Sequence, residues 1–74
     1  MTMEQIRELV DATPFQPFTI HLADGQSVRV PHPDFIAIGP RGRTVIVYRS
    51  DERFRIIDVM LVTELRVGRK RVVR

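Results

Sequence analysis

The sequence predicts a mainly β (α+β) fold, in which an N-terminal helix precedes a five- to six-stranded antiparallel sheet that forms a small barrel or a curled sheet. Two observations predict it. Apolar residues at helical spacing fill the first dozen positions, and short alternating segments separated by Gly, Pro and Asp turns fill the rest. With 74 residues there is room for a single domain, which we place at residues 1–68, ahead of a basic C-terminal tail at residues 69–74.

The helix is expected at about residues 3–12. Met3 and Ile6 begin an apolar face with helical spacing. Thr2, with a glutamine three residues later, matches a capping box, in which each side chain bonds the backbone of the other. Pro14 ends the helix, because the residue before a proline is restricted to extended backbone.

The β-sheet is expected to span about residues 18–67 and to open with a hairpin. Residues 18–23 and residues 26–30 each alternate apolar and polar side chains, which is the pattern of a half-buried strand. Asp24-Gly25 joins them, and this pair is preferred in a tight type I′ turn.

Further strands are expected after a break at Pro31 and Pro33, because proline cannot donate a hydrogen bond within a sheet. The continuous apolar run at residues 45–48 predicts burial on both faces of its strand, one in the core and the other under the helix or a neighbouring subunit. In the next strand, the alternation predicts that Arg53 and Arg55 share the outward face. These strands are expected at residues 35–38, 43–49, 53–57 and 62–67.

Basic residues gather toward the C-terminal third of the chain. The net charge is +3, and residues 49–74 carry eight of the twelve basic residues but four of the nine acidic ones. All but one of the basic residues are arginine, whose guanidinium suits bidentate contacts with phosphate. An exposed aromatic such as Tyr48 adds a surface on which a base can stack. The candidate nucleic-acid-binding residues are Arg41, Arg43, Arg53, Arg55, Arg69, Lys70, Arg71 and Arg74. The alternative is a solvated surface whose arginines pair with neighbouring carboxylates.

His32 and Asp34 form the best polar constellation in the sequence. A carboxylate can orient an imidazole for proton transfer or metal binding, and His21 is expected nearby. The alternative is that the two residues cap a rigid loop through backbone hydrogen bonds. The sequence contains no apparent nucleophile with an adjacent base and no Gly-rich phosphate loop, and with no Cys and two His it lacks the ligands of a structural zinc site. We therefore predict no catalytic residue, no metal site and no cofactor.

Residues 18–25 (FTIHLADG) resemble the first strand and turn of the Sm-like (Hfq) family. Asp34-Phe35 resembles the acidic-aromatic pair that opens the third strand of that family, and residues 54–67 are similar to its last two strands in hydrophobic rhythm. This resemblance implies a small Sm-like or SH3-like barrel with RNA as a ligand.

A second resemblance covers residues 14–25 (PFQPFTIHLADG) and residues 31–35 (PHPDF). These two segments resemble a set of short bacterial proteins that have no assigned activity. The resemblance implies a small stand-alone bacterial protein and implies nothing about its chemistry.

These observations predict a non-enzymatic small β-barrel binding module with nucleic acid, RNA in particular, as its ligand. The alternative is a protein-interaction or regulatory subunit that acts through a strand edge or a helix face. A homo-oligomer is expected, because a chain this short builds only a small core. No apolar run approaches the ~20 residues that span a bilayer, and the first residues lack the layout of a signal peptide, so we expect no membrane contact and a cytoplasmic location.

Overall fold

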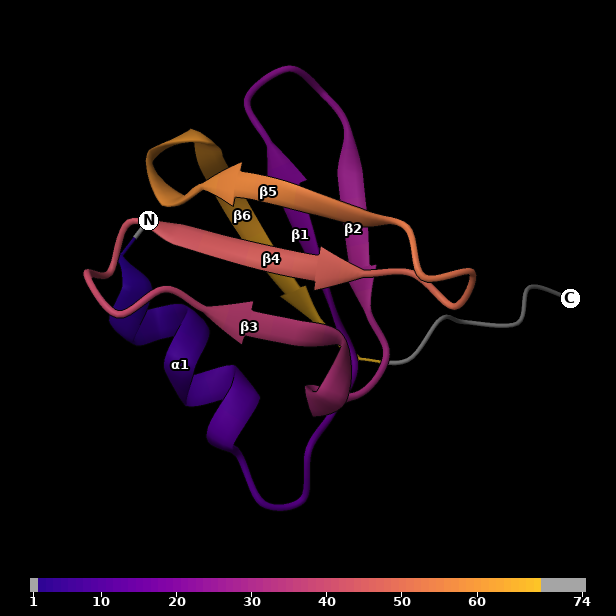
Figure 1. Cartoon of the computed structure of the whole chain (residues 1–74). Helices are drawn as coiled ribbons and strands as arrows, with labels where there is room; N and C mark the ends of the chain where they lie inside the picture. Colours follow the sequence, from indigo (N-terminus) through magenta and orange to yellow (C-terminus); the bar gives the residue numbers. More distant parts are fainter. Residues whose placement is uncertain (1, 69–74) are drawn as a thin grey trace, which may run out of the picture.

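The computed structural model describes residues 2–68. One helix and six antiparallel strands make a mainly β fold, as the sequence predicts (Figure 1). The elements are α1 (Met3–Asp11), β1 (Phe18–Leu22), β2 (Ser27–Val30), the short 3-10 helix η1 (Pro33–Phe35), β3 (Ile36–Ile38), β4 (Thr44–Tyr48), β5 (Phe54–Asp58), the 3-10 helix η2 (Val59–Leu61) and β6 (Val62–Val67).

Helix α1 begins and ends where its sequence signals place it. The Gln5 side-chain oxygen accepts hydrogen bonds of 3.2 Å from both the backbone N–H and the hydroxyl of Thr2. The chain leaves the helix after Asp11, because Ala12 already has extended backbone. Met3 and Ile6 are buried and attach the helix to the core. The expected helix at residues 3–12 is confirmed.

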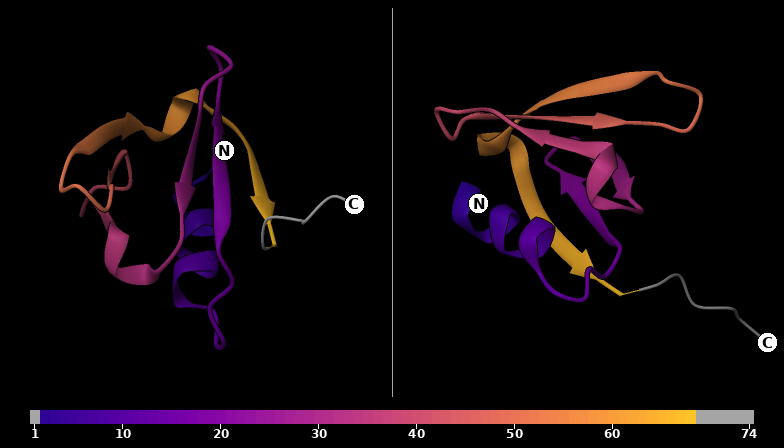
Figure 2. Two further views of the ribbon diagram at one scale, coloured as in Figure 1. Left: turned by 90° about the vertical axis from the view of Figure 1, so that its right-hand side faces the viewer. Right: turned by 60° about the horizontal axis from the view of Figure 1, so that its bottom comes forward.

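The strands form two three-stranded sheets, in the orders β2-β1-β6 and β3-β4-β5. We call these the first and the second sheet; Figure 2 shows them facing each other as two layers. Of the two arrangements that the sequence left open, a barrel or a curled sheet, a closed barrel is not formed by residues 2–68. The chain passes from the first sheet to the second through Pro31 and η1, and returns through η2. A 3-10 turn interrupts the ladder of hydrogen bonds at each crossing, and the first crossing also contains Pro31 and Pro33. No strand pair joins the two sheets within residues 2–68.

The hydrophobic core lies between the two sheets. Phe18 and Ile20 from the first sheet and Val45 and Val47 from the second are fully buried there. Helix α1 adds Ile6 and lies along one open side of this sandwich, beside β3 and β6 (Figures 1 and 2). The helix therefore covers one of the two gaps that an unclosed barrel leaves.

The β1–β2 hairpin is confirmed, but its expected type I′ turn is wrong. The N–H of Leu22 donates to the carbonyl of Gln26, and the N–H of Gly25 donates to the carbonyl of Leu22, both at 2.9 Å. Gly25 has φ +91°, whereas Asp24 does not have the positive φ that a type I′ turn needs. The loop therefore has three residues, with Gly25 in the left-handed position that lets the chain rejoin the strand.

The β4–β5 hairpin has the same turn without a glycine. The N–H of Arg49 donates to the carbonyl of Arg53 at 2.7 Å, and the N–H of Glu52 donates to the carbonyl of Arg49 at 2.9 Å. Glu52 takes the left-handed position with φ +70°, a conformation that costs a non-glycine residue on the order of 1–2 kcal/mol. The Asp51 carboxylate accepts a 3.1 Å hydrogen bond from the backbone N–H of Arg53, which supports the turn.

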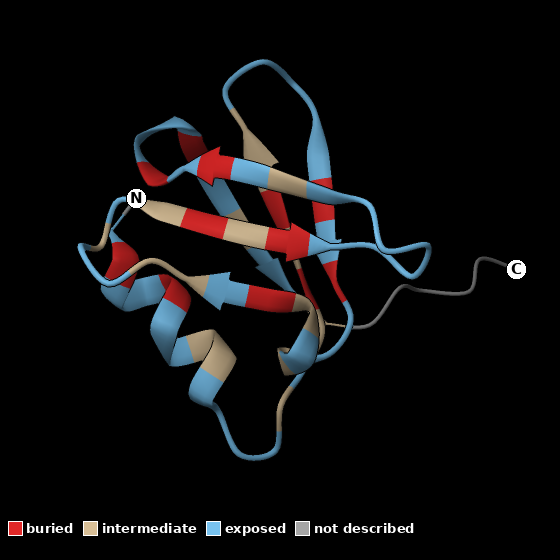
Figure 3. Ribbon diagram, viewed as in Figure 1, coloured by how far each residue is buried: buried red, intermediate tan, exposed pale blue. Residues whose placement is uncertain are grey.

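Strand β4 alternates instead of burying both faces. Val45 and Val47 are buried, Ile46 is half-buried, and Tyr48 is 43% exposed. Within residues 2–68 the second sheet packs only its inner face on the core, so buried residues alternate with half-buried and exposed ones along β4 (Figure 3). Burial of the other face under the helix is therefore wrong, and burial under a neighbouring subunit stays a prediction.

Strand β5 has the opposite phase to the one expected. Ile57 is buried opposite Val45, so Arg55, two residues earlier, also points inward, and Phe54 and Ile56 point outward. The alternation breaks at the Ile56-Ile57 pair, and in the structure it is Ile57 that packs on the core, opposite the buried Val45 of β4.

A search of residues 2–68 for membrane spans finds no helix with the length and apolar character to cross a bilayer.

Candidate binding surfaces

The described arginines of the candidate nucleic-acid set do not converge on one surface. Arg41 and Arg43 lie just before β4 and Arg53 lies beyond its end, so the length of the strand separates them (Figure 1). Arg55 points between the two sheets, where its guanidinium donates to the Gln26 side-chain oxygen at 2.9 Å. The remaining members, Arg69, Lys70, Arg71 and Arg74, lie outside the described residues.

Two of these arginines sit beside carboxylates. Arg43 lies 4.0 Å from Asp58, and Arg53 lies 3.5 Å from Asp51. Both pairs are well exposed, so each contributes little to stability. They do lower the positive charge at both ends of the second sheet, which is the arrangement expected for a solvated surface.

His32 and Asp34 cap a loop. The Nδ1 atom of His32 accepts a 3.2 Å hydrogen bond from the backbone N–H of Asp34 at the start of η1. The Asp34 carboxylate lies 3.6 Å from the same Nδ1 atom, which is too far for a hydrogen bond. His32 instead lies beside the ring of Phe15, with 6.4 Å between the ring centroids.

His21 is separate from that loop. It lies on the outer face of β1, opposite Ser27 on one side and Glu64 on the other. Its Nε2 atom is buried and has no hydrogen-bond partner within the described part of the chain. No three His, Cys, Asp or Glu side chains of residues 2–68 gather into a group that could hold a metal ion.

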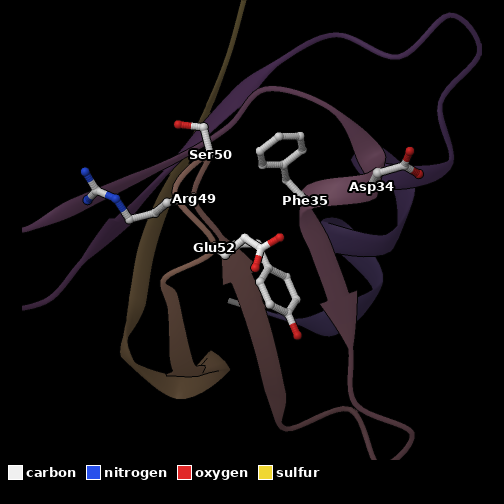
Figure 4. Close-up of a pocket in the computed structure, with 6 residues that line it drawn as sticks. Asp34, Phe35, Arg49, Ser50 and Glu52 are labelled. Atoms are coloured by element: carbon white, nitrogen blue, oxygen red, sulfur yellow. The ribbon is translucent and has the colours of Figure 1, made fainter.

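A hollow of about 490 Å³ opens between η1 and the β4–β5 turn. Asp34, Phe35, Arg49, Ser50 and Glu52 line it with Tyr48. In Figure 4 the Arg49 side chain extends away from Phe35 and from both carboxylates. The hollow therefore has mixed charge and no converging polar groups, which a ligand pocket needs.

The outer face of the first sheet is polar. Thr19 lies at its centre, between Arg29 and Arg66, and the guanidinium of Arg29 donates to the Thr19 hydroxyl at 3.1 Å. Arg66 lies 3.3 Å from the Glu64 carboxylate. This is the ordinary composition of a sheet face in contact with water.

The outer face of the second sheet is apolar. The apolar outer face, as we call it, consists of Ala37, Ile46, Tyr48, Phe54 and Ile56. Ile56 is 66% exposed and Phe54 is 53% exposed. The rings of Tyr48 and Phe54 pack together across the two strands, with centroids 5.6 Å apart. Nothing within residues 2–68 covers the side chains of Phe54 and Ile56, and Figure 3 shows exposed residues alternating with half-buried and buried ones along β5.

Sequence reasoning missed this surface because it assigned β5 the wrong phase. With Arg53 and Arg55 outward, Phe54 and Ile56 belonged to the core, and Tyr48 stood alone as an exposed aromatic. The available signal was the neighbouring pair Ile56-Ile57, since two adjacent apolar residues in a strand cannot both face the core.

No family model matches this chain, and no curated protein and no solved structure is significantly similar to it.

Proposed function

We propose that this protein is a non-enzymatic interaction module that binds another protein chain through the apolar outer face. The observation that carries the proposal is the contrast between the two sheets. The first sheet presents arginine, glutamate and threonine to water, whereas the second presents Tyr48, Phe54 and Ile56.

Both faces belong to one small domain with one small core, so the apolar side chains that stay outside this core need an explanation. Leaving these side chains in water forgoes about 25 cal/mol for each Å² that a partner would bury. The two rings alone, 43% and 53% exposed, leave on the order of 200 Å² uncovered. Contiguous apolar patches rimmed by polar residues mark interaction sites in proteins, and here the charged turns at both ends of β4 form such a rim.

The test is affinity capture with two variants matched in size and number of changes. The first, Phe54→Ser with Ile56→Ser, removes the apolar outer face, and the second, Arg29→Ser with Arg66→Ser, alters the polar face of the other sheet. All four side chains are exposed, so both variants should stay folded by circular dichroism. We expect bound protein chains to be lost with the first variant and retained with the second. Equal capture by both variants and the parent would contradict the proposal.

Nucleic-acid binding is the second candidate, and one observation favours it. Arg29 and Arg66 flank Thr19 on the polar face, and the guanidinium of Arg29 lies 3.5 Å from the carbonyl oxygen of Gly68, where the described chain ends. The sequence continues from that point with residues 69–74, four of which are basic. The basic segment of the sequence therefore begins directly after a residue that Arg29 contacts, and a polyanion is the ligand that such basic residues would bind.

A salt series tests this second candidate. We expect binding to single-stranded RNA to weaken steeply as salt rises, and deletion of residues 69–74 to make that dependence shallower by reducing the number of phosphate contacts. The Arg29→Ser, Arg66→Ser variant should weaken binding to all sequences alike. A folded parent protein that binds neither RNA nor DNA at low salt would exclude this function.

A relationship to the Sm-like fold is also part of the proposal. It is supported by the element order, in which a helix precedes short antiparallel strands and the last strand, β6, returns to pair with β1. The two separate sheets make the proposed relationship one of topology and not of a closed barrel.

A further inference from the structure

We propose that the chain covering the apolar outer face is a second copy of this protein, stacked face to face, with its strands antiparallel to those of the first copy. This inference rests on the proposed function and names the partner for the same surface. It follows from how the apolar pairs and the charges are distributed along β4 and β5.

The apolar side chains form two neighbouring pairs across the strands. Tyr48 lies opposite Phe54, and one step along the strands Ile46 lies opposite Ile56. A two-fold axis that lies in the plane of the interface, crosses the strands at right angles and passes between the two pairs places each aromatic pair on the aliphatic pair of the other copy. Two sheets packed in this way interdigitate the aromatic side chains of one copy with the aliphatic side chains of the other, as the facing layers of a β-sandwich do.

One charge at each end of the face is complementary to the other under this axis. Glu52 lies in the turn at one end and Arg41 in the turn at the other, and neither takes part in an ion pair among residues 2–68. Antiparallel stacking brings Glu52 of each copy to the end that holds Arg41 of the other. A two-fold axis parallel to the strands would instead place like charges together, which disfavours that arrangement.

The layout of the face agrees with a small symmetric interface. Such interfaces have an apolar centre and a polar rim. The apolar outer face has an uncharged centre, and the turns 39–42 and 49–53 supply charged residues at the rim. Figure 2 shows that no other described segment lies over this side of the second sheet.

The arrangement predicts a reciprocal contact, because Phe54 of one copy sits on Ile56 of the other. A charge placed at either position meets an apolar residue twice in a homodimer. Phe54→Lys alone and Ile56→Glu alone should therefore each weaken self-association on the order of 100-fold. When the two variants are mixed, the introduced lysine meets the introduced glutamate at one contact, and the native Phe54 meets the native Ile56 at the other.

The experiment is sedimentation equilibrium on the full chain over a concentration series. We expect the parent protein to have twice the 8.6 kDa mass of the chain at micromolar concentration, each variant alone to be monomeric, and an equimolar mixture to dimerise again. Ser27→Lys and Ser27→Glu, on the exposed outer face of β2, are the control variants and should dimerise like the parent. Circular dichroism checks that every variant is folded.

Three results would overturn the inference. They are a monomeric parent protein at several hundred micromolar, variants that dimerise as tightly as the parent, and a mixture that stays monomeric. The proposed function survives a monomeric parent if capture of a different protein still depends on Phe54 and Ile56. If neither self-association nor capture depends on these residues, the proposed function fails as well.

Discussion

Two adjacent isoleucines of β5 test the phase of the strand, on which the apolar outer face depends. Ile56 is 66% exposed and Ile57 is 4% exposed, although they have the same side chain and the same secondary structure. Each is replaced by alanine in turn, so that only the face of the sheet differs between the two variants.

The expected free-energy costs follow from burial. Ile57 packs on the core opposite Val45, so its truncation removes buried methyl and methylene groups and leaves a cavity, at a cost of about 2–5 kcal/mol. Ile56 loses little contact within its own chain, and its truncation should change the free energy of unfolding by no more than about 0.5 kcal/mol. In a domain of this size 1 kcal/mol corresponds to about 4–8 °C in Tm.

Urea unfolding measures both variants against the parent protein. The titration is repeated at a tenfold lower protein concentration, because self-association through Ile56 would add a concentration-dependent contribution. Ile57→Val, with an expected cost of about 0.5–1.5 kcal/mol, serves if the alanine variant is too unstable to measure. Equal costs for Ile56→Ala and Ile57→Ala at low concentration would refute the strand phase.

Four further changes test other parts of the fold by thermal or urea unfolding. Gly25→Ala should cost about 1–2 kcal/mol from backbone conformation alone, since its Cβ meets no atom within 4 Å, and a variant as stable as the parent would contradict the left-handed turn. Glu52→Gly should stabilise by about 0.5–1 kcal/mol, because it relieves a positive φ, and a loss of stability would contradict that reading. Asp58→Ala should cost about 1 kcal/mol, because its carboxylate accepts a 2.9 Å bond from the N–H of Met60, whereas Asp58→Asn should keep most of that stability; equal losses would exclude a capping role. Ile6→Ala should cost about 2–5 kcal/mol if α1 packs on the core as described, and a negligible change would show that it does not.

Local signals predicted the parts of the fold that local chemistry controls. The capping pattern at Thr2 and the proline at position 14 located α1 to within a residue at each end. The strict alternation from residue 18 to residue 30, interrupted by Asp24-Gly25, located β1 and β2 and paired them correctly.

Features that depend on contacts between distant residues could not be predicted in this way. Whether Ile56 or Ile57 faces the core is decided by the pairing with Val45 and Val47, and either phase fits the sequence of β5 taken alone. Whether the strands close into a barrel could not be predicted for a similar reason. Pro31 signals a break in the strand, but the sequence does not say whether the ladder resumes on the same sheet or on a second one.

The same distinction between local signals and contacts between distant residues applies to the candidate site. Composition identified the arginines, but their positions along β4 decide whether they converge, and Arg41 and Arg53 lie at opposite ends. The apolar outer face depends on the phase of β5. The prediction that Arg55 faces outward placed Phe54 and Ile56 in the core, so this face was not predicted.

Thiol reactivity offers the most direct test of the claim that the apolar outer face is accessible and becomes covered by a partner. The chain contains no cysteine, so Ile56→Cys, Ile57→Cys and Ser27→Cys each introduce a single reactive group. In dilute solution a thiol reagent should label positions 56 and 27 quickly and position 57 slowly. As protein concentration rises, labelling at position 56 should slow down while labelling at position 27 stays unchanged. Rapid labelling of position 57, or a rate at position 56 that is independent of concentration and of any added protein partner, would contradict the account.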